Sequence, residues 1–237
     1  MKRWIILLVI FSLLSVPTLA SNQQGKFQVG ISFEPLIPQG EFGDVLDHMG
    51  WGGSLDVFYR IPKSDLMIGT VFAYHVYGWD TRWEPLSMYI PDVWVKVRTS
   101  NALIRGHLVL RIQPSFGYMR PYVEGLVGLQ HLTTDTRVYD DYDYENNLIA
   151  STNQLRSTVL SYGLGGGLVM NLSRLPYKHR RRRFSIMLDI GIRYLQGGSA
   201  EYLIPGDIEV IGDTVHYFIN RSQTDILTPK IGVTFMF

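Results

Sequence analysis

The sequence predicts an all-β protein: a single up-and-down barrel of eight antiparallel strands that spans a membrane. Three observations favour this fold. Eight segments alternate, residue by residue, between apolar and small or polar side chains, which is the period of a β-strand. The connections between these segments alternate between short and long, and the amino terminus has the features of an export signal. Residues 1–20 would be the signal peptide and residues 21–237 one barrel domain.

The amino terminus has the three parts of a secretory signal peptide. Lys2 and Arg3 form a basic start, Trp4–Leu14 is apolar, and Ala20 ends a segment of small residues where a peptidase would cleave. The alternative is a membrane-anchor helix, but the apolar stretch is too short to cross about 30 Å of hydrocarbon. The sequence also contains no Cys, which excludes disulfides, thiolate metal sites and a lipid-anchored mature protein. We therefore expect an exported β protein.

The clearest strand runs from Phe184 to Leu195. Every second residue is apolar, and the residues between them are Ser185, Met187, Asp189, Gly191 and Arg193. A half-buried strand of a soluble protein has a solvated polar face, usually rich in Lys, Glu and Thr. Small residues and an Asp/Arg pair instead suit a strand that faces lipid on one side and a narrow interior on the other.

Seven further segments show the same alternation. They are 27–35, 53–60, 66–77, 102–113, 121–131, 158–172 and 226–237. The total of eight strands is even, as closure of an antiparallel barrel requires. Strands of about 11 residues, rising roughly 3.3 Å per residue at a tilt near 40°, would cover an apolar band of about 25 Å.

The connections give a second argument, because short and long ones alternate along the chain. The short connections are those around Lys63, at 114–119 and at 173–183, and the long ones are 37–50, 78–100, 132–157 and 196–224. All the long connections would then lie at one end of the barrel. Outer-membrane barrels have this asymmetry, whereas a soluble β-sandwich has no reason to adopt it.

Aromatic residues near the predicted strand ends favour a membrane boundary, where rings with a polar edge gather. The alternative is that they belong to an ordinary core. The candidates are Trp51, Tyr59, Tyr74, Tyr77, Trp79, Trp94, Tyr118, Tyr122, Phe184 and Tyr194.

These features together resemble the small outer-membrane β-barrels of the OmpA/OmpX kind. The resemblance rests on the signal peptide, the eight strands, the uneven connections and the final sequence Val233-Thr234-Phe235-Met236-Phe237, and it covers the whole mature chain. It implies localisation in the outer membrane of a gram-negative bacterium. It also implies that Phe237 closes the last strand and is read by the barrel-assembly machinery. Because the sequence stops at the eighth strand, no periplasmic peptidoglycan-binding domain is expected.

If the apolar faces meet lipid, ten titratable side chains point into the barrel. They are Glu34, Asp56, Glu124 and Asp189, with Arg60, Arg105, Arg111, Arg193, Lys230 and His107. Eight strands enclose a space that side chains just fill. Charges there lose water and must pair, so we predict a closed lumen with an ion-pair network. Gly163, Gly165 and Gly167 would leave room for the arginines, or they would only allow the strand to bend.

Two charged stretches lie between the predicted strands. Arg180, Arg181, Arg182 and Arg183 fall in the third short connection, where we expect them beside anionic lipid headgroups on the periplasmic side. Nucleic acid is the alternative, but an export signal and a net charge of only +1 argue against it. The acidic stretch 139–147 would offer oxygen ligands to Ca²⁺, but it lacks the pattern of a calcium loop, so an acidic surface loop is favoured. We expect no cofactor and no metal.

Three functions remain open on the sequence alone. The favoured one is a non-enzymatic, monomeric outer-membrane protein whose long loops contact lipopolysaccharide or another surface ligand. The second is an outer-leaflet lipid-modifying enzyme, with His131, Ser199 and His216 as candidates near the outer loops; no nucleophile elbow or metalloprotease motif supports it. The third is a narrow channel for small or hydrophobic solutes.

Overall fold

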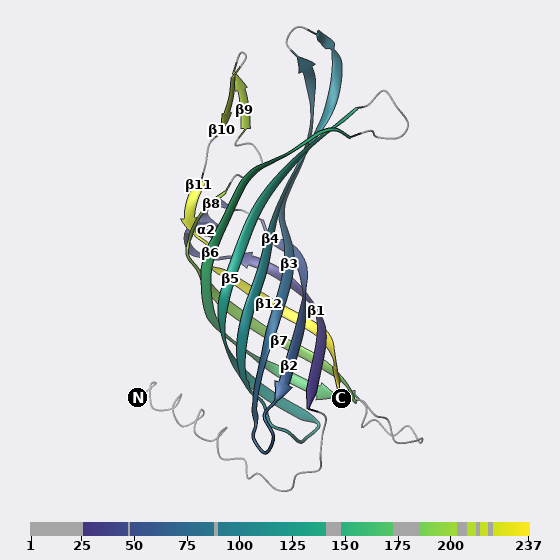
Figure 1. The fold of residues 1–237 in the computed structure, drawn as a ribbon, viewed down its shortest axis with the longest axis vertical. Coiled ribbons are helices and arrows are strands. Elements are labelled where there is room, and N and C mark those ends of the chain that lie inside the picture. Colours follow the sequence, from purple (N-terminus) through teal and green to yellow (C-terminus); the bar gives the residue numbers. More distant parts are fainter. Residues whose placement is uncertain are drawn as a thin grey trace.

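The computed structural model describes residues 26–46, 48–87, 90–140, 148–172, 185–202, 208–211, 214–217 and 220–237. The predicted signal peptide and Arg180–Arg183 lie outside these residues. Eight long strands close into one barrel (Figure 1). They are β1 (Phe27–Pro38), β2 (Gly50–Arg60), β3 (Leu66–Ser87), β4 (Ile90–Ile112), β5 (Met119–Asp140), β6 (Leu148–Asn171), β7 (Ser185–Gly197) and β12 (Ile226–Met236).

Smaller elements lie in two of the connections. The helix α2 (Gly40–Val45) follows β1. Between β7 and β12, two short antiparallel ladders are formed by β8 (Ser199–Tyr202) with β11 (Asn220–Gln223), and by β9 (Ile208–Ile211) with β10 (Thr214–Tyr217). Within the described part of the chain, no helix is long and apolar enough to cross a bilayer.

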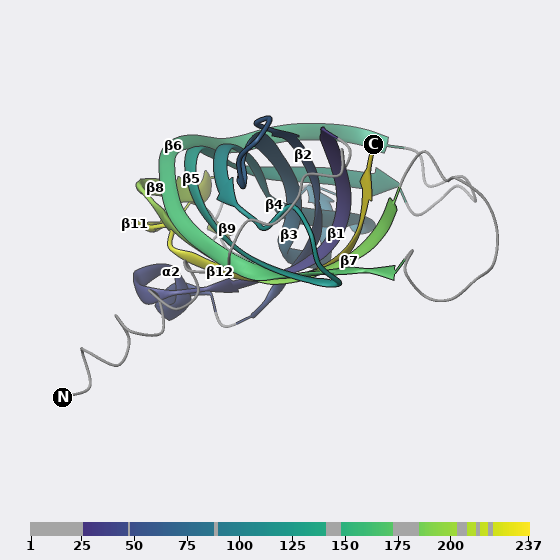
Figure 2. The ribbon, with the colours of Figure 1, turned by 90° about the horizontal axis from the view of Figure 1, so that it is seen from below.

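The barrel closes between its first and last strands. Each strand pairs in antiparallel fashion with its neighbours in sequence, and β1 pairs with both β2 and β12, so that the wall surrounds the axis (Figure 2). At the seam Ile31 lies opposite Val233. The backbone N–H of Phe237 donates to the carbonyl oxygen of Phe27 at 2.9 Å. The predicted eight-stranded antiparallel barrel is confirmed.

Four strands continue well beyond the closed part of the barrel. β2 pairs with β3 only as far as Val76, and β7 pairs with β6 only up to Ser161. β3 to β6 nevertheless stay paired with one another further along, and they rise above the other barrel strands in Figure 1. The expectation that 78–100 and 132–157 are loops is wrong. Apolar alternation stops there because no lipid face must be covered, but residues with high strand propensity such as Thr, Val and Tyr continue the backbone ladder.

We call the end of the barrel with these continuations the extended end, and the opposite end the turn end. The described short connections, 61–65 and 113–118, lie at the turn end, as predicted. Gly117 in the second of them has a φ of 109°, a conformation that favours glycine. The third short connection falls largely outside the described residues.

The barrel wall is apolar outside and polar inside. Large apolar side chains on the outer face are mostly exposed, for example Ile31 at 67%, Leu108 at 64% and Leu164 at 73%. Inside, the largest fully buried side chains include Arg105 and Arg193. A water-soluble protein would not leave such a continuous apolar surface uncovered. The distribution is that of a β-barrel that spans a membrane.

The aromatic residues divide between the two faces of the wall. Trp51, Tyr74, Trp79, Tyr118 and Tyr194 are exposed, as the prediction of a membrane boundary requires, and Tyr59 is half-buried. The prediction is wrong for Tyr77 and Tyr122, which are 1% and 4% exposed and point inward. Phe184 and the side chain of Trp94 lie outside the described part of the structure.

Candidate functional site in the barrel interior

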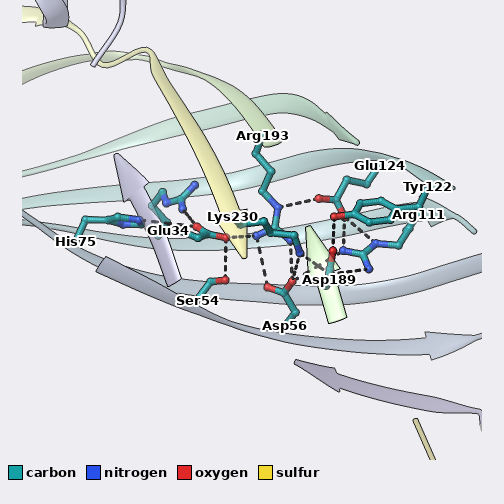
Figure 3. A network of polar contacts seen from close by, with 11 residues as sticks. Glu34, Ser54, Asp56, His75, Arg111, Tyr122, Glu124, Asp189, Arg193 and Lys230 are labelled. Carbon is teal, nitrogen blue, oxygen red and sulfur yellow. Dashed lines mark hydrogen bonds and ion pairs between the residues drawn. The ribbon is translucent and has the colours of Figure 1, made fainter. Parts of the chain in front are cut away.

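All ten predicted interior residues have their side chains inside the barrel, and none is more than 7% exposed. Eight of them form one connected network, which we call the ion-pair cluster (Figure 3). Its acids are Glu34, Asp56, Glu124 and Asp189, and its bases are Arg105, Arg111, Arg193 and Lys230. Four carboxylates thus balance four cations. An isolated buried charge would be very unfavourable. The stability of the ion-pair cluster therefore depends on this overall charge balance more than on any single ion pair.

Arg193, on β7, is the hub of the ion-pair cluster. Its Nη1 lies 2.6 Å from Oε1 of Glu34, its Nη2 2.9 Å from Oδ2 of Asp56, and its Nε 2.7 Å from Oε1 of Glu124. The three carboxylates come from β1, β2 and β5, so one guanidinium ties together strands on different sides of the wall (Figure 3). Such charge-assisted hydrogen bonds are the strong ones.

The remaining cations complete the pairing. Nζ of Lys230 lies 2.8 Å from both Asp56 and Asp189. Nη2 of Arg105 lies 2.5 Å from Glu34, which also accepts a hydrogen bond from the hydroxyl of Ser54 at 2.8 Å. Each carboxylate is therefore held by at least two donors, as buried charges require.

Arg111 is stacked between two aromatic rings near the turn end of the ion-pair cluster. Its guanidinium carbon lies 3.9 Å from the ring centroid of Phe58 and 4.0 Å from that of Tyr122. The same guanidinium binds Glu124, with Nη2 at 2.7 Å and Nε at 2.8 Å from Oε2. Tyr122 also donates its hydroxyl to Asp189 at 2.9 Å. Cation–π contact and ion pairing together fix a flat, space-filling layer across the lumen.

Apolar layers lie beyond the cluster at both ends. Towards the extended end, Phe42 of α2 is fully buried and packs edge-on against Tyr202 and Tyr77, with ring centroids 5.2 and 5.8 Å away. We call this the apolar cap; it also contains Leu36, Leu46, Leu103, Leu132, Val159, Leu195, Ala200 and Ile226. The same apolar cluster continues along the inside of the wall to Phe58, Met67, Val71, Val109 and Leu126. Towards the turn end, Val169, Met187 and Met236 pack with Tyr122.

The other two predicted interior residues lie outside the ion-pair cluster. Nη1 of Arg60 donates to the carbonyl oxygen of Gln113 at 2.9 Å, near the turn end. Nε2 of His107 lies 3.2 Å from the hydroxyl of Ser161. Both are buried, but each is held by uncharged groups.

Sequence reasoning missed several polar members of the interior. They are Ser54, His75, Arg120, Tyr122, Gln130 and Ser161. The signal was present, because each occupies the face of its strand that alternates with the apolar, outward side chains. The predicted set contains only titratable residues of the expected strands, and Arg120 precedes the strand expected over 121–131; Tyr122 is predicted at the membrane boundary instead. His75 is 0% exposed and places Nε2 3.8 Å from Glu34.

Two of the three predicted glycines on β6, Gly165 and Gly167, lie beside the ion-pair cluster, whereas Gly163 lies against Leu195 of the apolar cap. A Cβ added to Gly165 would lie 3.0 Å from Cγ of Arg193 and 3.0 Å from Cγ of Glu124. One added to Gly167 would lie 2.6 Å from the hydroxyl of Tyr122. The room for the long side chains therefore comes from these positions.

We expect Gly165→Val to lower the free energy of unfolding by about 1–3 kcal/mol, because overpacking would displace the Arg193–Glu124 pair. The matched control is Gly166→Val, one residue along on the outer face, where an added Cβ comes no closer than 3.3 Å to the backbone oxygen of Tyr122. Urea unfolding in phospholipid vesicles measures both. Equal losses for the two variants would contradict the packing role of Gly165.

The candidate catalytic residues have separate partners. Nδ1 of His131 lies 2.8 Å from the hydroxyl of Thr158, and the hydroxyl of Ser199 accepts a hydrogen bond from Nε of Arg221 at 3.2 Å. His216 is on β10, and its side chain is outside the described structure. Among the described residues, no group of three His, Cys, Asp or Glu side chains is placed to hold a metal ion.

Several solved structures are similar to this chain. Neisserial surface protein A is 15% identical over 91% of this chain and 100% of its own, with a TM-score of 0.47. The attachment invasion locus protein Ail of Yersinia pestis is 15% identical over 92% and 100%, with a TM-score of 0.37. The amino-terminal β-barrel domain of OprF from Pseudomonas aeruginosa is 14% identical over 91% and 100%, with a TM-score of 0.30. No known family model and no curated protein matches the sequence. At these identities the likeness is one of fold alone.

Proposed function

We propose that this protein is a non-enzymatic, integral outer-membrane barrel of a gram-negative bacterium that is sealed along its axis and acts through its extended end. The observation that carries the proposal is the reversed polarity of the wall: an exposed apolar outer face surrounds a buried ion-pair cluster. Acyl chains would cover the outer face. The extended end would project from the cell surface, because short turns face the periplasm in such barrels.

The interior supports a closed lumen rather than a channel. Three successive layers cross it: the apolar cap, the ion-pair cluster, and the apolar layer with Met187 and Met236. A hydrated ion would have to break paired charges and pass two apolar layers, each of which is unfavourable. The protein would therefore act at its surface, not through transport.

Conductance in planar bilayers tests this function. We expect the refolded protein to insert without stepwise conductance. Insertion is verified separately by the faster gel mobility of unboiled protein, since folded barrels resist detergent. Regular conductance steps from protein that passes this check would contradict the sealed lumen and favour the channel.

The four-stranded continuation of β3 to β6 is the proposed contact surface for lipopolysaccharide or another extracellular ligand. In β3 and β4 this continuation runs from the pair Gly78–Asn101 to the pair Ser87–Ile90.

We also propose a monomer, because a closed barrel leaves no unpaired strand edge within the membrane. Arg180–Arg183 remain a predicted periplasmic contact with lipid headgroups. Chemical cross-linking in native membranes tests the monomer, which a ladder of multimers would contradict.

The carboxyl-terminal residue is the proposed signal for the barrel-assembly machinery. Phe237 is 54% exposed, and its backbone N–H pairs with Phe27 at the closing seam. We expect Phe237→Ala to reduce the folded fraction in cell membranes several-fold, while refolding into detergent in vitro stays near that of the unchanged protein. Gel mobility without boiling measures both. An equal defect in both settings would mean that the ring stabilises the fold rather than serving as a signal.

A further inference from the structure

A groove of about 920 Å³, which we call the outer groove, crosses the outer face of the barrel wall. This volume lies within the range of about 300–1,000 Å³ that is usual for ligand sites. Two rows of outward side chains border the groove, and each row takes one residue from each of five neighbouring strands, β3 to β7. One row contains Leu110, Gly125 and Leu164, and the other contains Leu108, Val127 and Tyr162.

Gly125 keeps the middle of the outer groove open. It lies on β5 between Leu110 of β4 and Leu164 of β6, and a Cβ added to it would meet no atom within 4 Å. A Cβ added to Gly69 or Gly163, in the floor of the groove, would instead collide with a backbone oxygen of a neighbouring strand. The packing of the wall therefore requires those two glycines but not Gly125. A glycine within a strand weakens it and often marks a place where a ligand approaches the backbone closely.

The path of the outer groove favours an acyl chain over a second copy of the barrel. The groove crosses five of the eight barrel strands, so it bends around the wall. Two barrels side by side touch along a line parallel to their axes, and a second convex wall would reach only part of this groove. A flexible acyl chain can follow it. Five strands about 4.8 Å apart span roughly 19 Å, and a chain from one leaflet covers about half of the 30 Å of hydrocarbon.

One end of the outer groove is polar. It lies on β7 at Tyr194 and Gln196, next to the extended end of the barrel. The hydroxyl of Tyr194 donates to Oδ2 of Asp225 at 3.2 Å, and Gln196 is exposed. The carboxamide N–H groups of Gln196 can donate to the carbonyl oxygen that links an acyl chain to its headgroup. A chain in the groove would therefore enter from the leaflet at the extended end, which is the cell-surface leaflet in the proposed orientation.

We propose that the outer groove binds one acyl chain of a lipopolysaccharide molecule whose headgroup lies beside Gln196. The proposal goes beyond general contact between lipid and the wall, because one chain would be held in a fixed place and would dissociate slowly. It rests on the proposed function for the membrane-facing wall and its orientation, but not for the sealed lumen.

Native mass spectrometry of the protein released from detergent micelles that contain purified lipopolysaccharide tests the site. We expect the unchanged protein to retain one lipopolysaccharide molecule, and Gly125→Leu to reduce the bound fraction several-fold because its side chain fills the groove. Gln196→Ala should also reduce this fraction. The matched control, Gly106→Leu, adds the same side chain to the outer face outside the groove, where a Cβ comes within 3.7 Å of the ring of Phe72, an ordinary contact. It should bind lipopolysaccharide like the unchanged protein.

Several results would overturn the proposal. Equal retention of lipopolysaccharide by the unchanged protein, Gly125→Leu and Gln196→Ala would show that the groove holds no particular chain. Preferential retention of phosphatidylethanolamine from mixed micelles would overturn the assignment to lipopolysaccharide, and a dimer that Gly125→Leu dissociates would identify a second copy as the occupant. Insertion into phospholipid vesicles, checked by the gel mobility of unboiled protein, separates two failures. An inserted barrel with equal retention overturns only the groove, whereas a protein that does not insert overturns the proposed function as well.

Discussion

Arg193→Met is expected to lower the free energy of unfolding by about 3–5 kcal/mol, because it leaves buried carboxylates without their shared cation. The hub contacts Glu34, Asp56 and Glu124 at 2.6–2.9 Å and is 0% exposed. Methionine keeps much of the side-chain volume, so the loss would reflect charge rather than a cavity. Urea unfolding in phospholipid vesicles, followed by tryptophan fluorescence, measures the change.

The control for Arg193→Met is Arg221→Met. Arg221 is exposed, with Nε bonded to the hydroxyl of Ser199, and its replacement should cost less than about 1 kcal/mol. A second substitution, Glu124→Gln in the Arg193→Met background, should restore part of the lost stability because it removes one of the excess negative charges. Equal losses for Arg193→Met and Arg221→Met would show that the cluster does not stabilise the barrel.

Leu108→Arg is expected to destabilise the protein in lipid vesicles by about 2–4 kcal/mol, the cost of a cation on the lipid face near mid-membrane. Leu108 lies on β4 within the apolar outer face and is 64% exposed. In a soluble barrel the same change would be harmless, because an exposed arginine would meet water. The substitution therefore tests the membrane-facing assignment of the whole wall.

Thr81→Arg is the matched control for Leu108→Arg, because Thr81 is an exposed residue on the continuation of β3 beyond the closed barrel. It should change the free energy of unfolding by less than about 0.5 kcal/mol. Unfolding in vesicles with thicker and thinner hydrocarbon gives a further check. If Leu108→Arg is tolerated as well as Thr81→Arg in every lipid, the outer face does not contact acyl chains.

The period-two pattern was enough to assign faces. Once the apolar residues of a strand such as β7 are placed outward, Asp189 and Arg193 must point inward, because side chains alternate strictly along a strand. His75 and Tyr122 also alternate with the outward apolar residues of their strands, so the same pattern places their side chains inside the barrel. Strand ends were less predictable: the ladder of β3 to β6 continues where alternation stops, because backbone pairing needs no apolar face.

The sequence by itself therefore determined the number of barrel strands, their direction and most of the buried charges, because these depend only on local alternation; Arg120, which is 1% exposed, is the buried cation that the prediction lacks. The tertiary structure decided which charges meet. Arg193 and Glu34 are 159 residues apart in sequence and lie within 2.6 Å only because barrel closure and strand register bring β1 and β7 to the same height around one axis. The placement of Phe42 in the apolar cap depends in the same way on the closed barrel, because a single buried ring in a connection has no periodicity that could predict its partners.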